Sequence, residues 1–125
     1  MQGMTGALTL AYALGRVCFG AGLLGPPRAL ATRWLGPDAE RPPVQAAVRG
    51  LAARDIAIAL GMADAVRRRA PARPWLVASI GGDLADIAAT LAAGDSLPER
   101  ARWGTVALAG ASAAAGAALL AAEAA

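Results

Sequence analysis

The sequence predicts an all-α fold: a four-transmembrane-helix bundle with a short interfacial helical segment between its first two helices. The chain of 125 residues is 57% hydrophobic, more apolar than a soluble domain of this size usually is. Four apolar segments alternate with turns rich in Pro, Gly and Arg, and every Trp lies near a segment end with an Arg within two residues. The length predicts a single integral membrane domain, residues 1–125.

The first membrane helix is predicted over residues 4–24. Its only charge is Arg16, and a helix of this length, at about 1.5 Å per residue, can cross a hydrocarbon core of about 30 Å. Small residues recur every fourth position at Ala7, Ala11 and Gly15, a stripe that favours close approach of another helix. Gly25-Pro26-Pro27 should end the helix, because proline supplies no amide donor.

The interfacial segment is predicted over residues 28–35, which are too few to span a bilayer. Leu30 and Trp34 lie four residues apart, and Arg28 and Arg33 flank them, as expected for a helical turn at the membrane surface. Residues 36–43 are expected to form a solvated loop, whose last prolines open the next helix.

The second and third helices are predicted over residues 44–66 and 75–93, with a short basic turn between them. Residues 67–73 carry four Arg and no acid. Asp64 precedes this turn and is expected to be a surface ion-pair partner of the arginines that follow it. The two helices should therefore run antiparallel.

The fourth helix is predicted over residues 103–122, after a loop at 94–100. This segment carries no charge, and Gly104, Gly110 and Gly116 lie along it. Such small residues suggest a close-packing face.

The tryptophans are predicted to anchor the bundle at the membrane interfaces, Trp34 and Trp103 at one face and Trp75 at the other. An even number of spans places both termini on the side of the basic turn. Because that turn is short and dense in Arg, we expect cytoplasmic termini in a multi-pass protein of the bacterial inner membrane.

Several classes of site are excluded by composition. Cys18 is the only cysteine and the chain has no His, so we expect no metal, no cofactor and no His general base, and Cys18 should pack as a small apolar residue. The net charge of +3 does not predict nucleic-acid binding, because the arginines are scattered and few aromatic residues are available to stack bases.

Charged residues near the midpoints of three predicted helices form the candidate binding site or ion-pair cluster. A lone charge at mid-bilayer costs about 2.5 to 3.5 kcal/mol, so we expect these side chains to pair in the bundle interior. The set of three arginines and three aspartates is formally neutral. Its members are Arg16, Arg49, Arg54, Asp55, Asp83 and Asp86.

Two interpretations of this cluster stay open. Asp83 and Asp86 are three residues apart and share one helix face, so Arg54 is expected within ion-pairing reach of one of them. The ion pairs could serve only to set the register of the helices. Alternatively, the face with Asp83 and Asp86 could line a polar cavity that binds a proton, a cation or a cationic small molecule.

Short motifs spread over nearly the whole chain: Gly15-Arg16-Val17-Cys18-Phe19-Gly20, Leu23-Leu24-Gly25-Pro26-Pro27, Trp34-Leu35-Gly36-Pro37, and Arg49-Gly50-Leu51-Ala52-Ala53-Arg54-Asp55 with Gly61. Together they resemble an uncharacterised group of small four-helix bacterial membrane proteins, the domain of unknown function 4267 type. The resemblance implies a membrane bundle in which Gly15-Arg16 and Arg54-Asp55 are recurrent polar positions. It implies no activity.

The sequence therefore predicts a protein without enzymatic activity, since carboxylates and arginines alone suit few reactions without a cofactor. Its expected role is an assembly or interaction component of the membrane, forming a homo-oligomer or joining a larger membrane complex through the small-residue faces of 4–24 and 103–122. The alternative is a small carrier or channel-like element for protons, cations or a cationic small molecule. The lipid bilayer is the expected partner in both cases.

Overall fold

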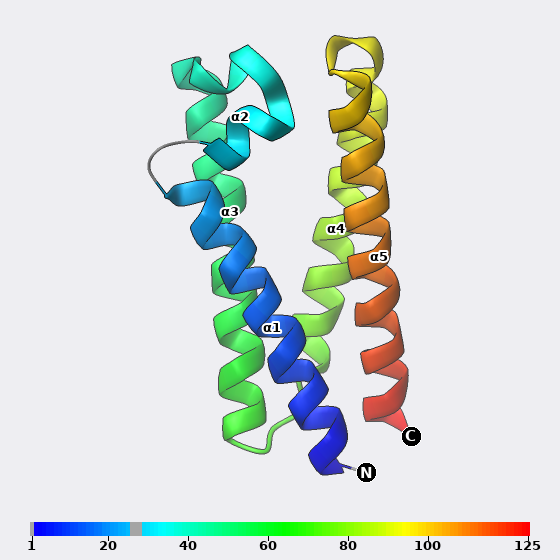
Figure 1. Ribbon diagram of the computed structural model, residues 1–125. Helices are drawn as coiled ribbons and strands as arrows, with labels where there is room; N and C mark the ends of the chain where they lie inside the picture. Colours follow the sequence, from blue (N-terminus) through cyan, green and yellow to red (C-terminus); the bar gives the residue numbers. More distant parts are fainter. Residues whose placement is uncertain (1, 26–28) are drawn as a thin grey trace.

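The computed structural model describes residues 2–25 and 29–125, and within these ranges every regular element is helical (Figure 1). The predicted helix end at Pro26 and Pro27, and Arg28 of the interfacial segment, lie outside the described residues. The elements in chain order are α1 (Gln2–Leu24), α2 (Ala29–Leu35), the 3-10 helix η1 (Gly36–Glu40), α3 (Pro42–Arg67), α4 (Arg73–Ala93), the 3-10 helix η2 (Gly94–Ser96) and α5 (Glu99–Ala124).

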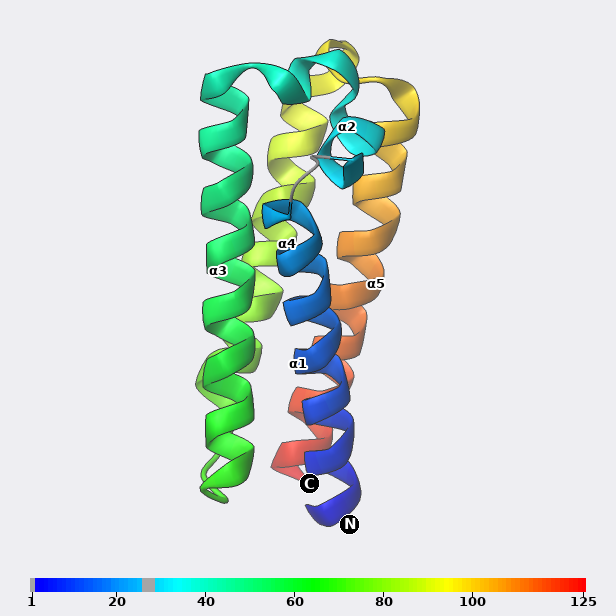
Figure 2. The same ribbon diagram turned by 60° about the vertical axis from the view of Figure 1, so that its left-hand side comes forward.

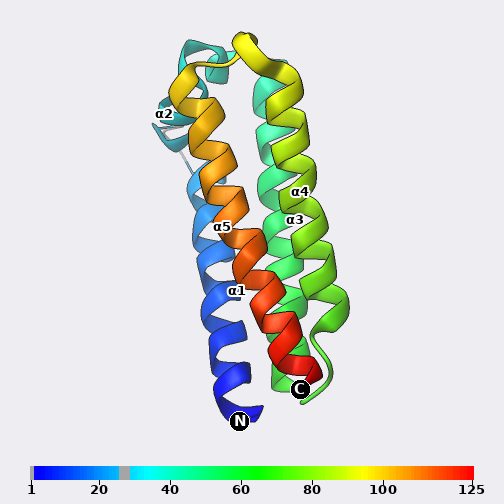
Figure 3. The same ribbon diagram turned by 90° about the vertical axis from the view of Figure 1, so that its right-hand side faces the viewer.

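The long helices form two antiparallel pairs that face each other. α1 packs mainly against α3, and α4 mainly against α5, so that in Figure 3 the pair α4/α5 lies in front of the pair α1/α3. Both chain ends and the α3–α4 turn lie at one end of the bundle, called here the terminal end (Figure 1). The opposite end, called the α2 end, carries α2, η1 and η2 (Figure 2).

The observed helices agree with the all-α prediction and correct several of its bounds. The expected solvated loop at residues 36–43 is largely the 3-10 helix η1, and its Ala39 is only 1% exposed because it packs into a core cluster. Helix α5 begins at Glu99 instead of residue 103, directly after Pro98, as is common for a helix that follows a proline. The short helix α2 is present where the interfacial segment was predicted.

Two apolar clusters hold the bundle together, and they differ in which helices they join. The terminal-end cluster joins all four long helices, through Ala13, Ile58, Ala59, Met62, Ala65, Ala72, Leu76 and Leu119. The α2-end cluster lies within the first helix pair and its connection, through Leu23, Ala31, Ala39, Val48 and Ala52. At the α2 end, no buried apolar cluster of the described residues joins α4 and α5 to α1 and α3.

Close helix approach occurs at some of the glycines and not at others. A Cβ at Gly116 would lie 3.0 Å from Ile80 and 3.2 Å from the Tyr12 hydroxyl, and a Cβ at Gly61 would overlap the Trp75 ring. By contrast, a Cβ at Gly15, Gly104 or Gly110 would meet no atom within 4 Å. The predicted close-packing face of the last helix is therefore wrong within this chain except at Gly116.

Three helices among the described residues are long and apolar enough to cross a membrane: Gly3–Leu24, Arg73–Ser96 and Glu99–Ala124. Helix α3 is longer than two of these segments, but it carries Arg49, Arg54 and Asp55 in or next to its first half. These charges lower its mean hydropathy below that of the other three.

Candidate functional site

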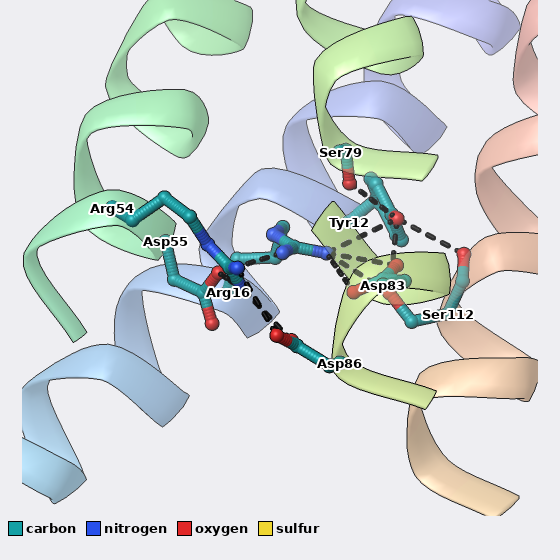
Figure 4. A network of polar contacts seen from close by, with 8 residues as sticks. All are labelled: Tyr12, Arg16, Arg54, Asp55, Ser79, Asp83, Asp86 and Ser112. Carbon is teal, nitrogen blue, oxygen red and sulfur yellow. Dashed lines mark hydrogen bonds and ion pairs between the residues drawn. The ribbon is translucent and has the colours of Figure 1, made fainter. Parts of the chain in front are cut away.

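Charged side chains from α1, α3 and α4 meet midway along the bundle, where the two helix pairs face each other (Figure 4). Arg16 donates through Nη2 to Asp55 Oδ1 at 2.7 Å and through Nη1 to both carboxylate oxygens of Asp83, at 3.1 and 3.2 Å. One guanidinium on α1 therefore ties α3 to α4.

A second arginine extends these contacts to a further carboxylate. Arg54 forms a two-pronged pair with Asp86, at 3.1 and 2.7 Å, and also donates to Asp55 Oδ1 at 3.2 Å. The result is a chain of alternating charge in the order Asp83, Arg16, Asp55, Arg54 and Asp86, called here the charge chain.

The charge chain is buried at one end and accessible at the other. Arg16 and Asp83 are 7% and 4% exposed, whereas the side chains of Arg54 and Asp86 are 33% and 27% exposed. Its two arginines face three aspartates, so one negative charge has no counter-charge within the chain of contacts.

Asp55 is the member of the charge chain with an unused acceptor. Both arginines donate to its Oδ1, while its Oδ2 accepts no hydrogen bond from the part of the chain that the structure describes. The residue is 4% exposed and lines the cavity described below. Among the described residues, the fully buried side-chain atoms without a partner are the Nε atoms of Arg16, Arg54 and Arg102, and Asp55 Oδ2 is not one of them. This oxygen is therefore accessible, and it marks a place where a proton, water or cation can be accommodated.

Hydroxyl groups continue the polar network toward α5. The Tyr12 hydroxyl donates to the Ser112 carbonyl at 3.0 Å and lies 2.8 Å from Ser79 Oγ, and Arg16 Nη1 donates to Ser112 Oγ at 3.0 Å. Sequence reasoning missed Tyr12 and Ser79 as members of the site. Their spacing was the available signal, since Tyr12 precedes Arg16 by four residues and Ser79 precedes Asp83 by four, which places each pair on one helix face.

Helix geometry explains why these side chains converge. Ser79, Asp83 and Asp86 follow the spacing of one face of α4, and that face turns toward α1 and α3. Gly82 lies beside them, and a Cβ there would lie 3.3 Å from Cζ of Arg54. The glycine therefore leaves room for the Arg54 guanidinium to lie against α4.

A cavity of about 680 Å³ extends from the charge chain toward the α2 end. The indole Nε1 of Trp34 on α2 donates to Thr105 Oγ1 of α5 at 2.7 Å, which links the two helix pairs beside this cavity. Its lining is mainly apolar and also contains three aspartates and two arginines: Ala11, Tyr12, Gly15, Arg16, Phe19, Leu23, Leu30, Arg33, Trp34, Leu51, Asp55, Asp83, Asp86, Ala89, Thr90, Gly104, Thr105, Leu108, Ala109 and Ser112.

The structure brings five of the six expected cluster residues together and leaves one out. Arg49 is exposed on α3 and forms no ion pair among residues 2–25 and 29–125. The expected inclusion of Arg49 is therefore wrong, and with it the expected neutrality of the cluster. The pair between Arg54 and the Asp83/Asp86 face is present, with Asp86 as its partner.

The tryptophans do not all share one environment. Trp75 in the first turn of α4 and Trp103 on α5 are exposed, and their helices start at opposite ends of the bundle. Trp34 is half-buried and donates to Thr105 of α5, and its role as an interface anchor stays a prediction. Its polar N–H finds a partner inside the protein instead of at a membrane surface.

Three residues outside the charge chain bear on the remaining predictions. Glu123 of α5 accepts hydrogen bonds from the backbone N–H groups of Ala72 and Arg73, both at 2.9 Å, and thus caps the start of α4, a role that the sequence did not predict. Cys18 is exposed on α1 instead of packed in the interior. Asp64 pairs with Arg67 and Arg68 at the end of α3, as expected.

The described part of the chain contains no group of three or more His, Cys, Asp or Glu side chains arranged to hold a metal ion. No family model, no curated protein and no solved structure matches the chain. The resemblance drawn from the sequence motifs therefore stays a prediction, and the function has to be argued from the geometry of the site.

Proposed function

We propose that the protein is a four-span membrane protein that binds a cation in its central cavity, as a small carrier or channel-like element. The observation that carries this proposal is the unused carboxylate oxygen of Asp55 at a cavity. The charge chain has one aspartate more than it has arginines, and the remaining arginine in the cavity lining, Arg33, forms no ion pair with it among the described residues. Ion pairs that only set helix register need no excess of acid, and an uncompensated buried charge is expensive.

The distribution of side chains supports a membrane location. The charge chain is inside the bundle, while large apolar side chains point outward on all four long helices, among them Leu14, Leu60, Leu84 and Leu108. Apolar side chains outside and paired charges inside are the arrangement that a lipid surrounding favours.

Helix α3 is proposed as the fourth span because it runs beside α1 (Figure 1). Its central charges, Arg54 and Asp55, face other helices through ion pairs. Arg49 lies seven residues after Pro42, about 10 Å along the helix, and a long arginine side chain can extend from that depth to the interface.

The proposed topology is the one expected from the sequence. Both termini share a face with the basic turn at residues 67–73, which we propose is the cytoplasmic face of a bacterial inner membrane. We also propose membership of the domain of unknown function 4267 type, on the basis of the sequence motifs given above. Assembly into a homo-oligomer or a larger complex stays a prediction. Gly15, Gly104 and Gly110 are uncovered in the single chain, and either a second protein or lipid would cover them.

Fractionation after an alkaline carbonate wash tests the membrane location. The protein should remain with the membranes, and recovery of most of it in the soluble fraction would contradict the proposal.

Cation binding is tested with Asp55→Asn, which removes the excess charge without changing the size of the side chain. Its retained oxygen can still accept from both arginines, so the variant should fold. The panel consists of protons, K⁺, tetramethylammonium and tetraphenylphosphonium, each titrated against thermal unfolding in mild detergent. A bound cation at one hundred times its Kd should stabilise the protein by about 2.7 kcal/mol.

The matched control is Asp64→Asn, which neutralises an acid that is paired at the surface. At least one cation of the panel should stabilise the wild-type protein and Asp64→Asn, but not Asp55→Asn. The cation-binding proposal is refuted when none of the four cations distinguishes wild-type protein from Asp55→Asn.

A further inference from the structure

Resting on the proposed function, we infer that the cation is an organic one with an apolar body, which reaches the cavity sideways from the lipid between α1 and α5. The inference is carried by the aromatic lining, the size of the cavity and the exposure of its rim.

The aromatic residues are concentrated around the cavity. The chain has one Tyr, one Phe and three Trp, and Tyr12, Phe19 and Trp34 all line this space. Aromatic faces attract cations whose charge is spread over organic groups. Together with the Asp55 carboxylate, these rings form the combination that recognises an ammonium or phosphonium group.

The size of the cavity also favours an organic ligand. Its volume of about 680 Å³ falls within the range of about 300 to 1,000 Å³ that is typical of sites for small organic molecules. An inorganic ion would fill a small part of it and leave the leucine side chains of the wall beside water. An apolar body would cover Leu23, Leu30 and Leu51, while its charge lies against Asp55.

The rim of the cavity opens to the side of the bundle. Leu108 is 57% exposed and Leu30 is also exposed, yet both line the cavity. Gly15 on α1 and Gly104 on α5 line it as well, and no side chain approaches the Cβ position of either. Because α1 and α5 do not close against each other at this level, an apolar molecule dissolved in the bilayer can reach the interior between them.

Equilibrium dialysis of the full-length protein in detergent, with radiolabelled probes, tests the ligand class. Tetraphenylphosphonium should bind at least tenfold more tightly than tetramethylammonium, which has the same charge and no aromatic groups. Tetraphenylborate, which has the same shape and the opposite charge, should bind at least tenfold more weakly than tetraphenylphosphonium. Asp55→Asn should reduce the affinity for tetraphenylphosphonium at least tenfold, and Phe19→Ala should reduce it severalfold.

The outcomes separate this inference from the proposed function. Equal or tighter binding of tetramethylammonium would overturn the ligand with an apolar body and leave cation binding in place. Equal binding of tetraphenylborate, unaffected by Asp55→Asn, would overturn both, since the cavity would then select for apolar bulk alone.

The lateral route is tested by narrowing the rim. Gly104→Phe should slow the association of tetraphenylphosphonium at least fivefold in stopped-flow measurements with the protein in lipid nanodiscs. Gly110→Phe is the matched control, because Gly110 is equally free of neighbours but does not line the cavity, and its association rate should equal that of the wild-type protein. Equal rates for both variants would overturn the route between α1 and α5.

Discussion

The two ends of the bundle are built from the same four helices and are held together by different means. At the terminal end, Met62 and Leu76 are fully buried in a cluster to which all four helices contribute. At the α2 end, the apolar cluster stays within α1, α2, η1 and α3. The junction with α4 and α5 is polar: it includes the charge chain, the hydrogen bonds to Ser112 beside it, and two hydrogen bonds between α2 and α5, from Trp34 to Thr105 and from Arg100 to the Arg33 carbonyl.

This difference is the reason for proposing the ligand site on the α2 side of the charge chain. At the terminal end a buried apolar cluster joins the two helix pairs, whereas at the α2 end the helix pairs are separated by the cavity. The polar contacts at the α2 end therefore hold the two helix pairs together across the cavity.

Loss of Arg16 should cause the largest destabilisation. Arg16→Ala leaves Asp83 without a cation and Asp55 with one partner instead of two, and removing one member of a buried pair costs about 3 to 5 kcal/mol. Denaturant unfolding in detergent measures the loss. The double variant Arg16→Ala/Asp83→Ala should be more stable than the sum of the two single losses predicts, and strict additivity would show that the pair is not coupled.

A methyl group at Gly61 tests the close packing of the terminal end. In Gly61→Ala the new Cβ would overlap the Trp75 indole, so α3 and α4 must shift apart, at a cost of about 1 to 3 kcal/mol. The same substitution at Gly110 is the control, since nothing lies near its Cβ position and Ala favours a helix by up to about 1 kcal/mol over Gly. A stabilised Gly61→Ala variant would contradict the contrast between the two ends.

The hydrogen bond from Trp34 of α2 to Thr105 of α5 should contribute less to the free energy of unfolding. Trp34→Phe keeps an aromatic ring but removes the donor to Thr105, and the expected loss in unfolding free energy is about 1 kcal/mol. Hydrogen exchange should become faster in α2 and remain unchanged at the terminal end. Thr105→Val removes the same bond from the other side, so the double variant should lose little more than either single variant.

The smallest effect is expected at Arg49. This side chain is exposed and unpaired in the described structure, so Arg49→Ala should change the unfolding free energy by less than about 0.5 kcal/mol. Arg54→Ala, five residues later in the same helix, should cost several times more because Asp86 and Asp55 lose a donor. Equal losses at the two positions would place Arg49 in the network after all.

The sequence predicted the helices well because hydropathy and proline positions are local signals. It also predicted that Arg16, Arg54 and the carboxylates would meet, since unpaired charges are costly in apolar surroundings. The error at Arg49 was avoidable. Five residues separate it from Arg54, which corresponds to about 140° around an α-helix, so both arginines could not face the same partner helix.

Other features of the site depend on information that no local pattern contains. The choice of Asp86 over Asp83 as the partner of Arg54 depends on how far α4 is shifted along α3. The inward turn of Trp34 depends on where α2 comes to lie against α5. The cavity itself arises because small residues on α1 and α5 fail to meet, although the same residues suggested close packing in the sequence.

The shared oxygen of Asp55 has a mechanical consequence for the bundle. Because Oδ1 accepts from Arg16 and Arg54 together, and these arginines hold Asp83 and Asp86 on α4, one atom on the first helix pair lies between both attachments to the second. A change of charge at Asp55 would alter both attachments at once. We therefore expect that protonation of Asp55, or a cation bound to it, changes the distance between the two helix pairs.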